Sequence, residues 1–441
     1  MTTVSTASGA LSFEQADQAV RRYCERVPAP QSEPVKLLDS LGRVLAEEIT
    51  ADRDFPPFPR STRDGYAVRA ADVKNIPAML RVVGQIKAGA SFDASLNAGE
   101  AVEIMTGASL PAGADAVVMV EHTAVAGGTV EHMSAAANDM VEDASASASH
   151  ASDSGSEVEI RRAVSSGENF VPAGAEAHAG DVLLKPGASI TPAHVAMLAA
   201  VGRAKVSVYR RPRVAVLSTG DELVDISETP GPQQIRNSNS YSLCAQVTEA
   251  GGEPLQLPVA PDEERKLTTL MHAGLDSGDL LLLSGGVSMG KFDLVEQALS
   301  KLGAQFFFTG ALIQPGRPVV FGEVRKNSRA LPFFGLPGNP VSVMTTFDLF
   351  VRPLLDALAG APPRRTPSAG ARLKKAFRTK IGLTRFLPAV LEGGLYDPVV
   401  EVVPWQGSGD LLAASKANCY VVISPDREII EEGEMLTVVM R

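Results

Sequence analysis

The second half of the chain contains three short apolar runs, each of which stops at a polar, glycine-containing turn and is followed by a helix-like stretch. They are RVAVLSTGDEL (213–223), DLLLLSGGVSMGKFD (279–293) and PFFGLPGNPVS (332–342). This pattern is typical of a buried parallel strand. Because ligands bind at the carboxyl ends of the strands in doubly wound sheets, we expect the three turns to form one site.

The turns offer backbone N–H groups, helix N-termini and hydroxyls, which suit a phosphorylated ligand. We expect the carboxylates Asp221, Glu222 and Asp279 beside them, where they would suit a metal ion. The candidate binding residues are Thr219, Gly220, Asp221, Ser284, Gly285, Gly286, Ser288, Pro337, Gly338, Asn339 and Pro340. Each turn could instead be an ordinary strand-to-helix turn with good capping residues. Neither a GxxxxGK[ST] nor a GxGxxG motif is present, which disfavours ordinary ATPases and Rossmann dehydrogenases.

The same pattern divides the chain into domains. Strand-like and helix-like segments alternate over 211–361, which predicts a doubly wound α/β domain. Residues 54–174 contain prolines and short β-like pieces, which indicates an inserted β module. Residues 1–53 and 175–210 flank it, with helices expected after Ser12, around 37–49 and from Thr191. The segment 369–441 has only strand-like pieces, so a small β-barrel or sandwich is expected.

Residues from about 134 to 157 are Ser, Ala, Asp and Glu with almost no bulky apolar side chains. Such a segment cannot bury enough surface to offset its ordering entropy, so we interpret it as a disordered acidic insertion. A helix over its Ala-rich part is the alternative.

Composition narrows the function classes. The 441-residue chain has a net charge of −10, which argues against a nucleic-acid binder but leaves room for a small anion in a locally basic pocket. The three cysteines and six histidines show no metal-ligand or disulfide spacing. No signal-like N-terminus or apolar run of about 20 residues occurs, so we expect a soluble, cytoplasmic protein that does not bind membranes.

Several motifs together resemble those of one known family, the molybdopterin molybdenumtransferases (MoeA and the gephyrin E domain). They are STRDGYAV, EIMTGASLPAGADAVV, STGDEL, QIRNSN, LSGGVSMGKFD, QPGRP, LPGNPVS and WQGS, in the order of the family. The resemblance covers nearly the whole chain, and only the acidic insertion is foreign to it. It implies a multidomain fold with a central MogA-like α/β domain, an inserted β module and a C-terminal β-barrel.

The resemblance also implies a reaction. Such enzymes insert molybdate into adenylated molybdopterin and release AMP by a cleavage that depends on a divalent metal such as Mg²⁺. The matching catalytic positions here are Asp64, Thr106, Glu176, Glu222 and Asp279. The implied metal ligands are Glu222, Asn237 and Asp279, and Asn237 is also a candidate substrate-binding residue.

For molybdate, the matching positions are Gln314, Arg317, Arg385 and Ser408. An arginine presents a planar fork that suits an oxyanion, although any one arginine could be a solvated surface charge. Many relatives have Lys where this chain has Gln314, and some have Asp at the position of Asn237. Each departure removes a charge from a proposed binding site.

Two other functions remain open. The chain could be a molybdopterin adenylyltransferase that uses ATP, although that enzyme is a single domain. It could also be a scaffold or non-catalytic pterin-binding protein. The resemblance further implies a homodimer whose sites contain both subunits, and contacts with the adenylyltransferase and with acceptor molybdoenzymes.

Overall fold

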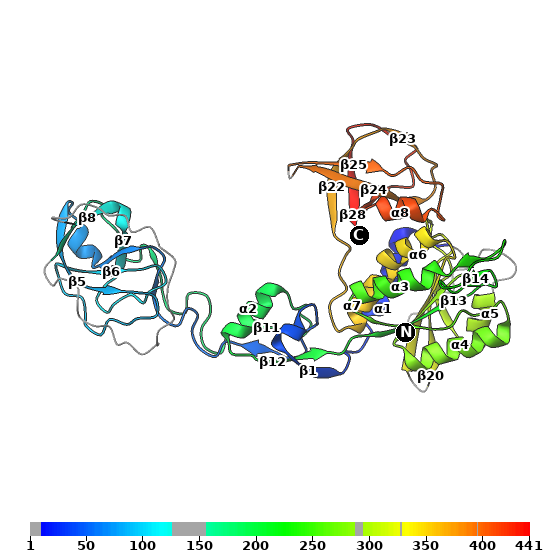
Figure 1. Ribbon diagram of the computed structural model, residues 1–441, viewed down its shortest axis with the longest axis horizontal. Coiled ribbons are helices and arrows are strands. Elements are labelled where there is room, and N and C mark those ends of the chain that lie inside the picture. Colours follow the sequence, from blue (N-terminus) through cyan, green and yellow to red (C-terminus); the bar gives the residue numbers. More distant parts are fainter. Residues whose placement is uncertain (1–9, 126–155, 287–293, 327–328, 395) are drawn as a thin grey trace. The chain divides into compact units, whose positions relative to one another are not determined.

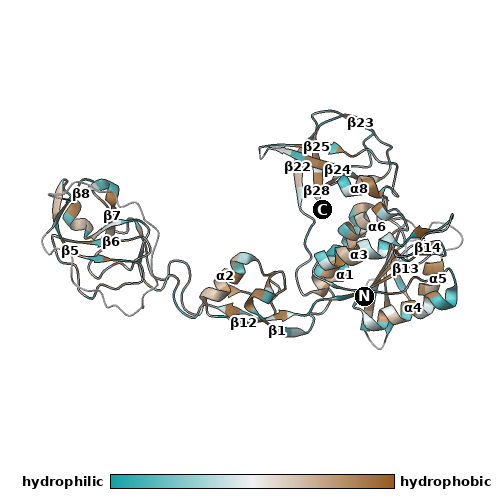
Figure 2. Cartoon of the chain, in the orientation of Figure 1, coloured by the Kyte–Doolittle hydropathy of each residue, from teal (hydrophilic) through white to brown (hydrophobic). Residues whose placement is uncertain are grey.

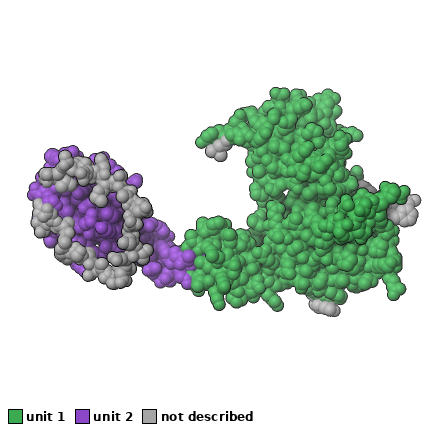
Figure 3. Space-filling model, in the orientation of Figure 1, with its two compact units in different colours: residues 1–47, 186–197, 203–441 green, residues 48–185, 198–202 purple. Residues whose placement is uncertain are grey.

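The computed structural model describes residues 10–125, 156–286, 294–326, 329–394 and 396–441. The chain forms two compact units, which Figure 3 colours separately. The first contains residues 1–47, 186–197 and 203–441, and the second contains residues 48–185 and 198–202. In the described part of the chain, no helix is both long and apolar enough to cross a membrane.

The core of the first unit is a six-stranded sheet covered by helices on both faces (Figure 1). Its strands, in spatial order, are β16 (Glu253–Gln256), β13 (Arg213–Ser218), β17 (Leu280–Ser284), β21 (Arg329–Leu336), β20 (Val320–Lys326) and β18 (Gln305–Phe308). The first four run parallel, whereas β20 is antiparallel to both its neighbours. The prediction of a doubly wound α/β domain is therefore confirmed, with a mixed sheet.

Alternation of side chains along the strands creates two apolar layers. Val214 and Val216 face one layer and Ala215 and Leu217 the other. The first layer contains α1 (Phe13–Cys24), α3 (Ser238–Glu249), α6 (Pro340–Thr346) and α7 (Arg352–Leu358); the second contains α4 (Glu264–Ser277) and α5 (Leu294–Lys301). In Figure 2, α4 carries both hydrophilic and hydrophobic residues, as expected of a helix that covers one face of a sheet.

The predicted helix after Ser12 is confirmed, and Ser12 caps it by accepting a hydrogen bond from the backbone N–H of Gln15 at 3.2 Å. The helix predicted around 37–49 is wrong, since only a 3-10 turn (Leu37–Ser40) forms there. Gly42 then takes a φ of +72°, and Leu45 forms a β-bridge with Val208. Pairing with β12 (Lys205–Tyr209) and the residues beside it favours an extended backbone here more strongly than the sequence pattern favours a helix.

The C-terminal segment closes into a barrel, which confirms the predicted β-barrel. Its strands are β19 (Ile313–Gln314), β24 (Thr384–Gly394), β25 (Asp397–Val402), β22 (Ser368–Leu373), β28 (Met435–Met440) and β26 (Cys419–Ile423), and β26 returns to pair with β24. A short helix that the strand pattern did not predict, α8 (Leu411–Lys416), is capped by Asp410. Parallel pairing of β19 with β24 joins the barrel to the α/β domain.

The second unit is rich in β-structure, as predicted for the inserted module. Its main sheet has the order β7 (Ala116–Met119), β4 (Gly65–Val68), β6 (Glu100–Ile104), β5 (Ala78–Ile86), β9 (Glu157–Ile160) and β8 (Thr123–Val125). The predicted acidic insertion lies almost wholly outside the described residues, and its last residue, Glu157, begins β9.

Candidate active site

The first two turns predicted from the sequence meet at the carboxyl edge of the central sheet. Ser218, at the end of β13, lies opposite Ser284 at the end of β17, and Ser284 lies opposite Leu336 at the end of β21. Beyond the strands, the backbone N–H of Thr219 donates to the Ser284 carbonyl at 3.0 Å. The N–H of Gly285 donates to the Leu336 carbonyl at 3.3 Å. The parallel register therefore holds three chain segments together without any side chain.

Close packing and positive φ angles explain the glycines of these turns. Gly285 has a φ of +91°, and a Cβ there would lie 2.5 Å from the carbonyl oxygen of Thr219. A Cβ on Gly220, whose φ is +145°, would lie 2.4 Å from a carboxylate oxygen of Glu222. A Cβ on Gly338 would lie 3.7 Å from the Cα of Gly285, so the third turn reaches the second. A side chain on Gly285 would meet backbone and force the two turns apart, whereas at Gly220 the constraint is the positive φ, because the Glu222 side chain can move.

Two residues that were not predicted also lie at this edge. Asp262 accepts a hydrogen bond from the Thr219 hydroxyl at 3.3 Å, and its backbone N–H donates to Asp221 at 3.0 Å. Asp262 follows β16 and opens the stretch leading to α4, so the strand-then-helix pattern could have identified it even though its turn lacks glycine. Asn239 donates from Nδ2 to the Ser284 hydroxyl at 2.9 Å and to the Gly338 carbonyl at 2.8 Å. Its buried Oδ1 has no hydrogen-bond partner among the described residues.

The prediction that Asp279 lies at the carboxyl edge is wrong. Asp279 precedes β17, and it accepts the backbone N–H of Arg213, the first residue of β13, at 2.9 Å. The amino ends of parallel strands lie at the opposite edge from their carboxyl ends, so Asp279 is remote from the turns. It binds Arg210 at 2.7 and 2.8 Å and also pairs with Arg329. Both cations and the burial of Asp279 indicate a structural ion-pair cluster.

Asn237 does not fit the predicted role of metal ligand. It is the N-cap of α3 and is 3% exposed. Its Oδ1 accepts the backbone N–H of Ser240 at 3.1 Å, and its Nδ2 donates to the Ser240 hydroxyl at 2.9 Å. Both ends of the amide are therefore used in capping the helix. Ser288, another candidate, lies outside the described residues.

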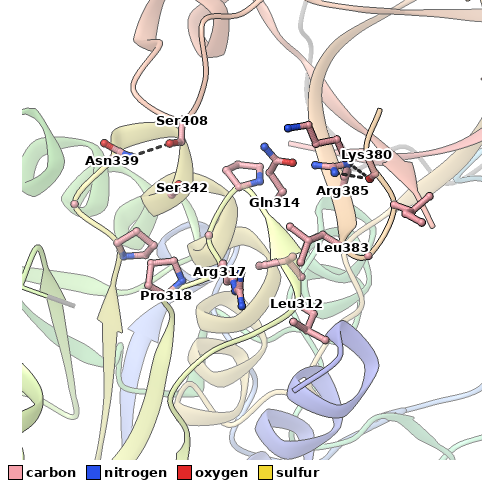
Figure 4. A pocket seen from close by; sticks show the side chains of 17 residues that line it. Leu312, Gln314, Arg317, Pro318, Asn339, Ser342, Lys380, Leu383, Arg385 and Ser408 are labelled. Carbon is pink, nitrogen blue, oxygen red and sulfur yellow. Dashed lines mark hydrogen bonds between the residues drawn. The ribbon is translucent and has the colours of Figure 1, made fainter. Parts of the chain in front are cut away.

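The four predicted molybdate residues line one cavity of about 770 Å³ between the α/β domain and the barrel (Figure 4). We call it the oxyanion pocket. Pairing of β19 with β24 places Gln314 directly opposite Arg385. On the other side, Asn339 donates from Nδ2 to the Ser408 hydroxyl at 2.7 Å. Pro337, Gly338 and Asn339 also line the pocket, so it continues from the third turn of the sheet edge.

The oxyanion pocket is electropositive because its cations lack nearby carboxylates. Arg385 is 5% exposed and donates from Nε to the Lys380 carbonyl at 3.1 Å. Burial lowers the pKa of this guanidinium from its ordinary value. Three cations line the pocket: Arg385, Arg317 and Lys380. None of them has an ion-pair partner among the described residues. Lys380 was not predicted, and it adds a third cation to the pocket.

The three predicted residues of the β module belong to the second unit. Asp64 accepts the backbone N–H of Thr106 at 2.7 Å, so two of them are in direct contact. Glu176 pairs with Arg60 at 3.0 Å. All three are exposed, so they are available to a ligand.

The carboxylates at the sheet edge suit a cation that shares its coordination with a ligand. Among the described residues there is no group of three or more His, Cys, Asp or Glu side chains that could hold a metal ion. Asp221 and Glu222 are exposed, and Asp262 lies against Thr219. Mg²⁺ typically takes one or two protein carboxylates and completes its shell with phosphate oxygens and water. The donors present therefore fit Mg²⁺ when a phosphorylated ligand is also there.

Comparison with known proteins covers almost the whole chain. Three protein-family models match: the MoeA N-terminal region (domain I and II) over residues 11–202, the probable molybdopterin binding domain over 215–357, and the MoeA C-terminal region (domain IV) over 370–440. The chain is 33% identical over 428 residues to the molybdopterin molybdenumtransferase of Bacillus subtilis (strain 168), covering 96% of this chain and 93% of the relative. It is 33% identical over 429 residues to the Haemophilus influenzae protein of the same name, covering 96% and 97%.

Solved structures agree with the sequence relatives. The crystal structure of the molybdopterin biosynthesis MoeA protein from Pyrococcus horikoshii OT3 matches with a TM-score of 0.75 and 28% identity, covering 98% of this chain and all of the other. A second structure described as molybdopterin biosynthesis MoeA protein from the same species matches with a TM-score of 0.68 and 32% identity, covering 98% and 99%. The fold of this chain is therefore found in known proteins.

Proposed function

Because the chain belongs to the MoeA family of molybdopterin molybdenumtransferases, we propose that it inserts molybdate into adenylated molybdopterin and releases AMP. The observation that carries the proposal is the continuity between the glycine turns and the oxyanion pocket, which share Pro337, Gly338 and Asn339. One site with a phosphate end and an oxyanion end suits a reaction in which a phosphorylated pterin and molybdate are bound together.

At the phosphate end, the chain supplies backbone donors. Gly286 is exposed and has no side chain, so a phosphate can approach the backbone of this turn. The Thr219 hydroxyl lies between this turn and Asp262. A divalent metal such as Mg²⁺, held on one or two of the carboxylates Asp221, Glu222 and Asp262 and on the phosphate itself, would neutralise charge on the phosphoanhydride.

At the oxyanion end, Arg317 and Arg385 attract the molybdate dianion, and the hydroxyl of Ser408 can donate to it. Asn339 holds Ser408 in place through the 2.7 Å hydrogen bond. Burial of Arg385 strengthens its attraction for the anion because the local dielectric constant is lower than in water. Desolvation of Arg385 is offset by the carbonyl of Lys380, which orients the guanidinium without neutralising it.

An AMP-release assay tests the proposal. Purified protein is given adenylated molybdopterin, Mg²⁺ and molybdate, and AMP is followed with and without molybdate. We expect molybdate-dependent release that falls about a hundredfold or more in Glu222→Ala, because a carboxylate near the transferring phosphate is lost. Glu228→Ala is the matched control: Glu228 is an exposed glutamate in the loop that follows β14 (Leu223–Val224), and its substitution should leave the rate unchanged.

The same assay separates the alternatives. Turnover only with ATP and free molybdopterin would indicate an adenylyltransferase, and binding without turnover would indicate a scaffold. The proposal includes a homodimer, as the family resemblance implies. Light scattering should then give roughly twice the 46.3 kDa mass of one chain.

A further inference from the structure

A second cavity, of about 640 Å³, lies in the C-terminal barrel next to the oxyanion pocket. It is formed by residues 375–380, two residues of β24 and the segment 401–406, together with Gln314. We call it the barrel pocket. Gln314, Lys380 and Arg385 line both cavities, so the two meet at the buried guanidinium of Arg385.

The walls of the barrel pocket differ from those of the oxyanion pocket. Trp405 packs against the barrel core and against Val341 and Met344 of α6, and it lines the pocket with its remaining surface. Its indole N–H has no hydrogen-bond partner in the part of the chain that the structure describes. Phe377, which also packs on the barrel core, is a second aromatic wall. Two aromatic side chains and a free N–H suit a flat heterocycle with polar edges.

Glu401 gives the barrel pocket a carboxylate, which the oxyanion pocket lacks. Its only ion pair in the described part of the chain is with Lys374 at 3.0 Å, and Lys374 also binds Glu392 at 2.7 Å. Glu401 is half-buried and therefore retains oxygens that can accept further hydrogen bonds. A carboxylate repels an oxyanion but can accept two parallel N–H bonds from a planar donor edge. Lys375 and Arg378 also line the barrel pocket, so Glu401 lies among cations and gives the pocket a hydrogen-bond acceptor that the oxyanion pocket lacks.

We propose that the barrel pocket binds the pterin ring of the substrate, with Glu401 accepting hydrogen bonds from the aminopyrimidine edge and Trp405 contacting the ring. This inference rests on the proposed function, and it adds the site of the ring to it. Molybdopterin carries its dithiolene between the pterin ring and the phosphate. With molybdate in the oxyanion pocket, the phosphate extends toward Gly338 and the glycine turns. The ring then extends past Arg385 in the other direction, which is where the barrel pocket opens.

The single tryptophan of the chain makes the proposal directly testable, since Trp405 is the source of all tryptophan emission. The probe is 6-hydroxymethylpterin, which is uncharged and has no phosphate or dithiolene. Titration into the full-length protein should quench Trp405 emission, and calorimetry should give the same Kd. In Glu401→Gln we expect the Kd for this pterin to rise about tenfold because one charge-assisted hydrogen-bond pair is lost.

Glu392→Gln is the matched control, since it removes the other carboxylate on Lys374 without lining the pocket. It should leave the pterin Kd unchanged. Equal pterin affinity in wild type and Glu401→Gln, or competition between pterin and molybdate for one site, would overturn the proposal. Thermal unfolding midpoints equal to that of the wild type show that the variants are folded.

Molybdate binding, measured separately, distinguishes this inference from the proposed function. Arg317→Ala should weaken molybdate binding and leave the pterin Kd unchanged, whereas Glu401→Gln should do the reverse. Pterin binding without any molybdate binding would contradict the proposed function and support the barrel pocket. Molybdate binding with AMP release, but with no effect of Glu401→Gln on pterin binding, would contradict the barrel pocket alone.

Discussion

Among single residues, Asp279 shows how surroundings decide whether a carboxylate serves chemistry or stability. Burial alone would raise the pKa of Asp279, but hydrogen bonds from Arg210 and the Arg213 N–H, with the charge of Arg329, hold it below its ordinary value. A carboxyl whose pKa is lower in the folded state than in the unfolded state stabilises the protein at pH values above its unfolded-state pKa. This stabilisation is lost as the pH falls through the folded-state pKa. For Asp279→Asn we therefore expect a loss of about 2 kcal/mol in the free energy of unfolding at pH 7.

Urea unfolding of both proteins between pH 7 and pH 2 measures this difference, which should shrink once the pH is below about 4. Asp276→Asn is the control, because Asp276 pairs with Lys326 at the same edge of the sheet but is more than half exposed. It should cost less than about 0.5 kcal/mol at any pH. A loss in Asp279→Asn that is constant across the pH range would show that the ion-pair cluster is not its cause.

At the scale of elements, the turn after β17 depends on backbone contact with the turn after β13. Gly285→Ala puts a Cβ 2.5 Å from the Thr219 carbonyl oxygen and also strains a φ of +91°. Gly303→Ala is a control that introduces the backbone strain alone, because Gly303 has a φ of +75° and no atom lies within 4 Å of the position its Cβ would take. We expect the control to lose about 1 kcal/mol of stability and Gly285→Ala about 3 kcal/mol. Chemical denaturation of both variants measures the difference, and equal losses would mean that the two turns do not pack as described.

The sequence predicted these elements better than it predicted the contacts between them. Apolar runs and glycines located the turns after β13, β17 and β21, because local pattern decides where a strand stops. The error at Asp279 came from treating a residue before a strand as though it followed one. Asp262 and Asn239 reach Thr219 and Ser284 only through packing of the sheet and α3, over 43 and 45 residues of chain. The helix predicted around 37–49 failed for a similar reason, since pairing with a distant strand decided its conformation.

At the scale of the first compact unit, a buried polar cluster fastens the barrel to the α/β domain. Asp348, in the π-helical turn Phe347–Val351 between α6 and α7, accepts hydrogen bonds from Tyr420 Oη at 3.3 Å and from Gln246 at 3.0 Å. Arg441 lies 4.0 Å from the Asp348 carboxylate and 5.4 Å from the centre of the Tyr420 ring. It also donates to the Ala414 carbonyl at 2.8 Å. Because the oxyanion pocket lies between the two domains, this cluster helps to set its width.

Removal of Arg441 should make the docking of the barrel pH-dependent. Burial raises the pKa of Asp348, while Arg441 and Arg352 lower it in part. A carboxyl whose pKa is higher in the folded state than in the unfolded state binds its proton more tightly when the protein is folded. The free energy of unfolding therefore falls as the pH rises from the unfolded-state pKa to the folded-state pKa. In Arg441→Ala this loss should grow to about 2 kcal/mol at pH 7, because a buried carboxylate loses its cation. Thermal unfolding and molybdate calorimetry at pH 5 and pH 8 measure this loss of stability.

The double variant Arg441→Ala, Asp348→Asn is the control, because it also removes the uncompensated charge. It should recover much of the stability and lose the pH dependence. If Arg441→Ala alone were equally stable at both pH values, the carboxylate of Asp348 would not be the group that Arg441 compensates.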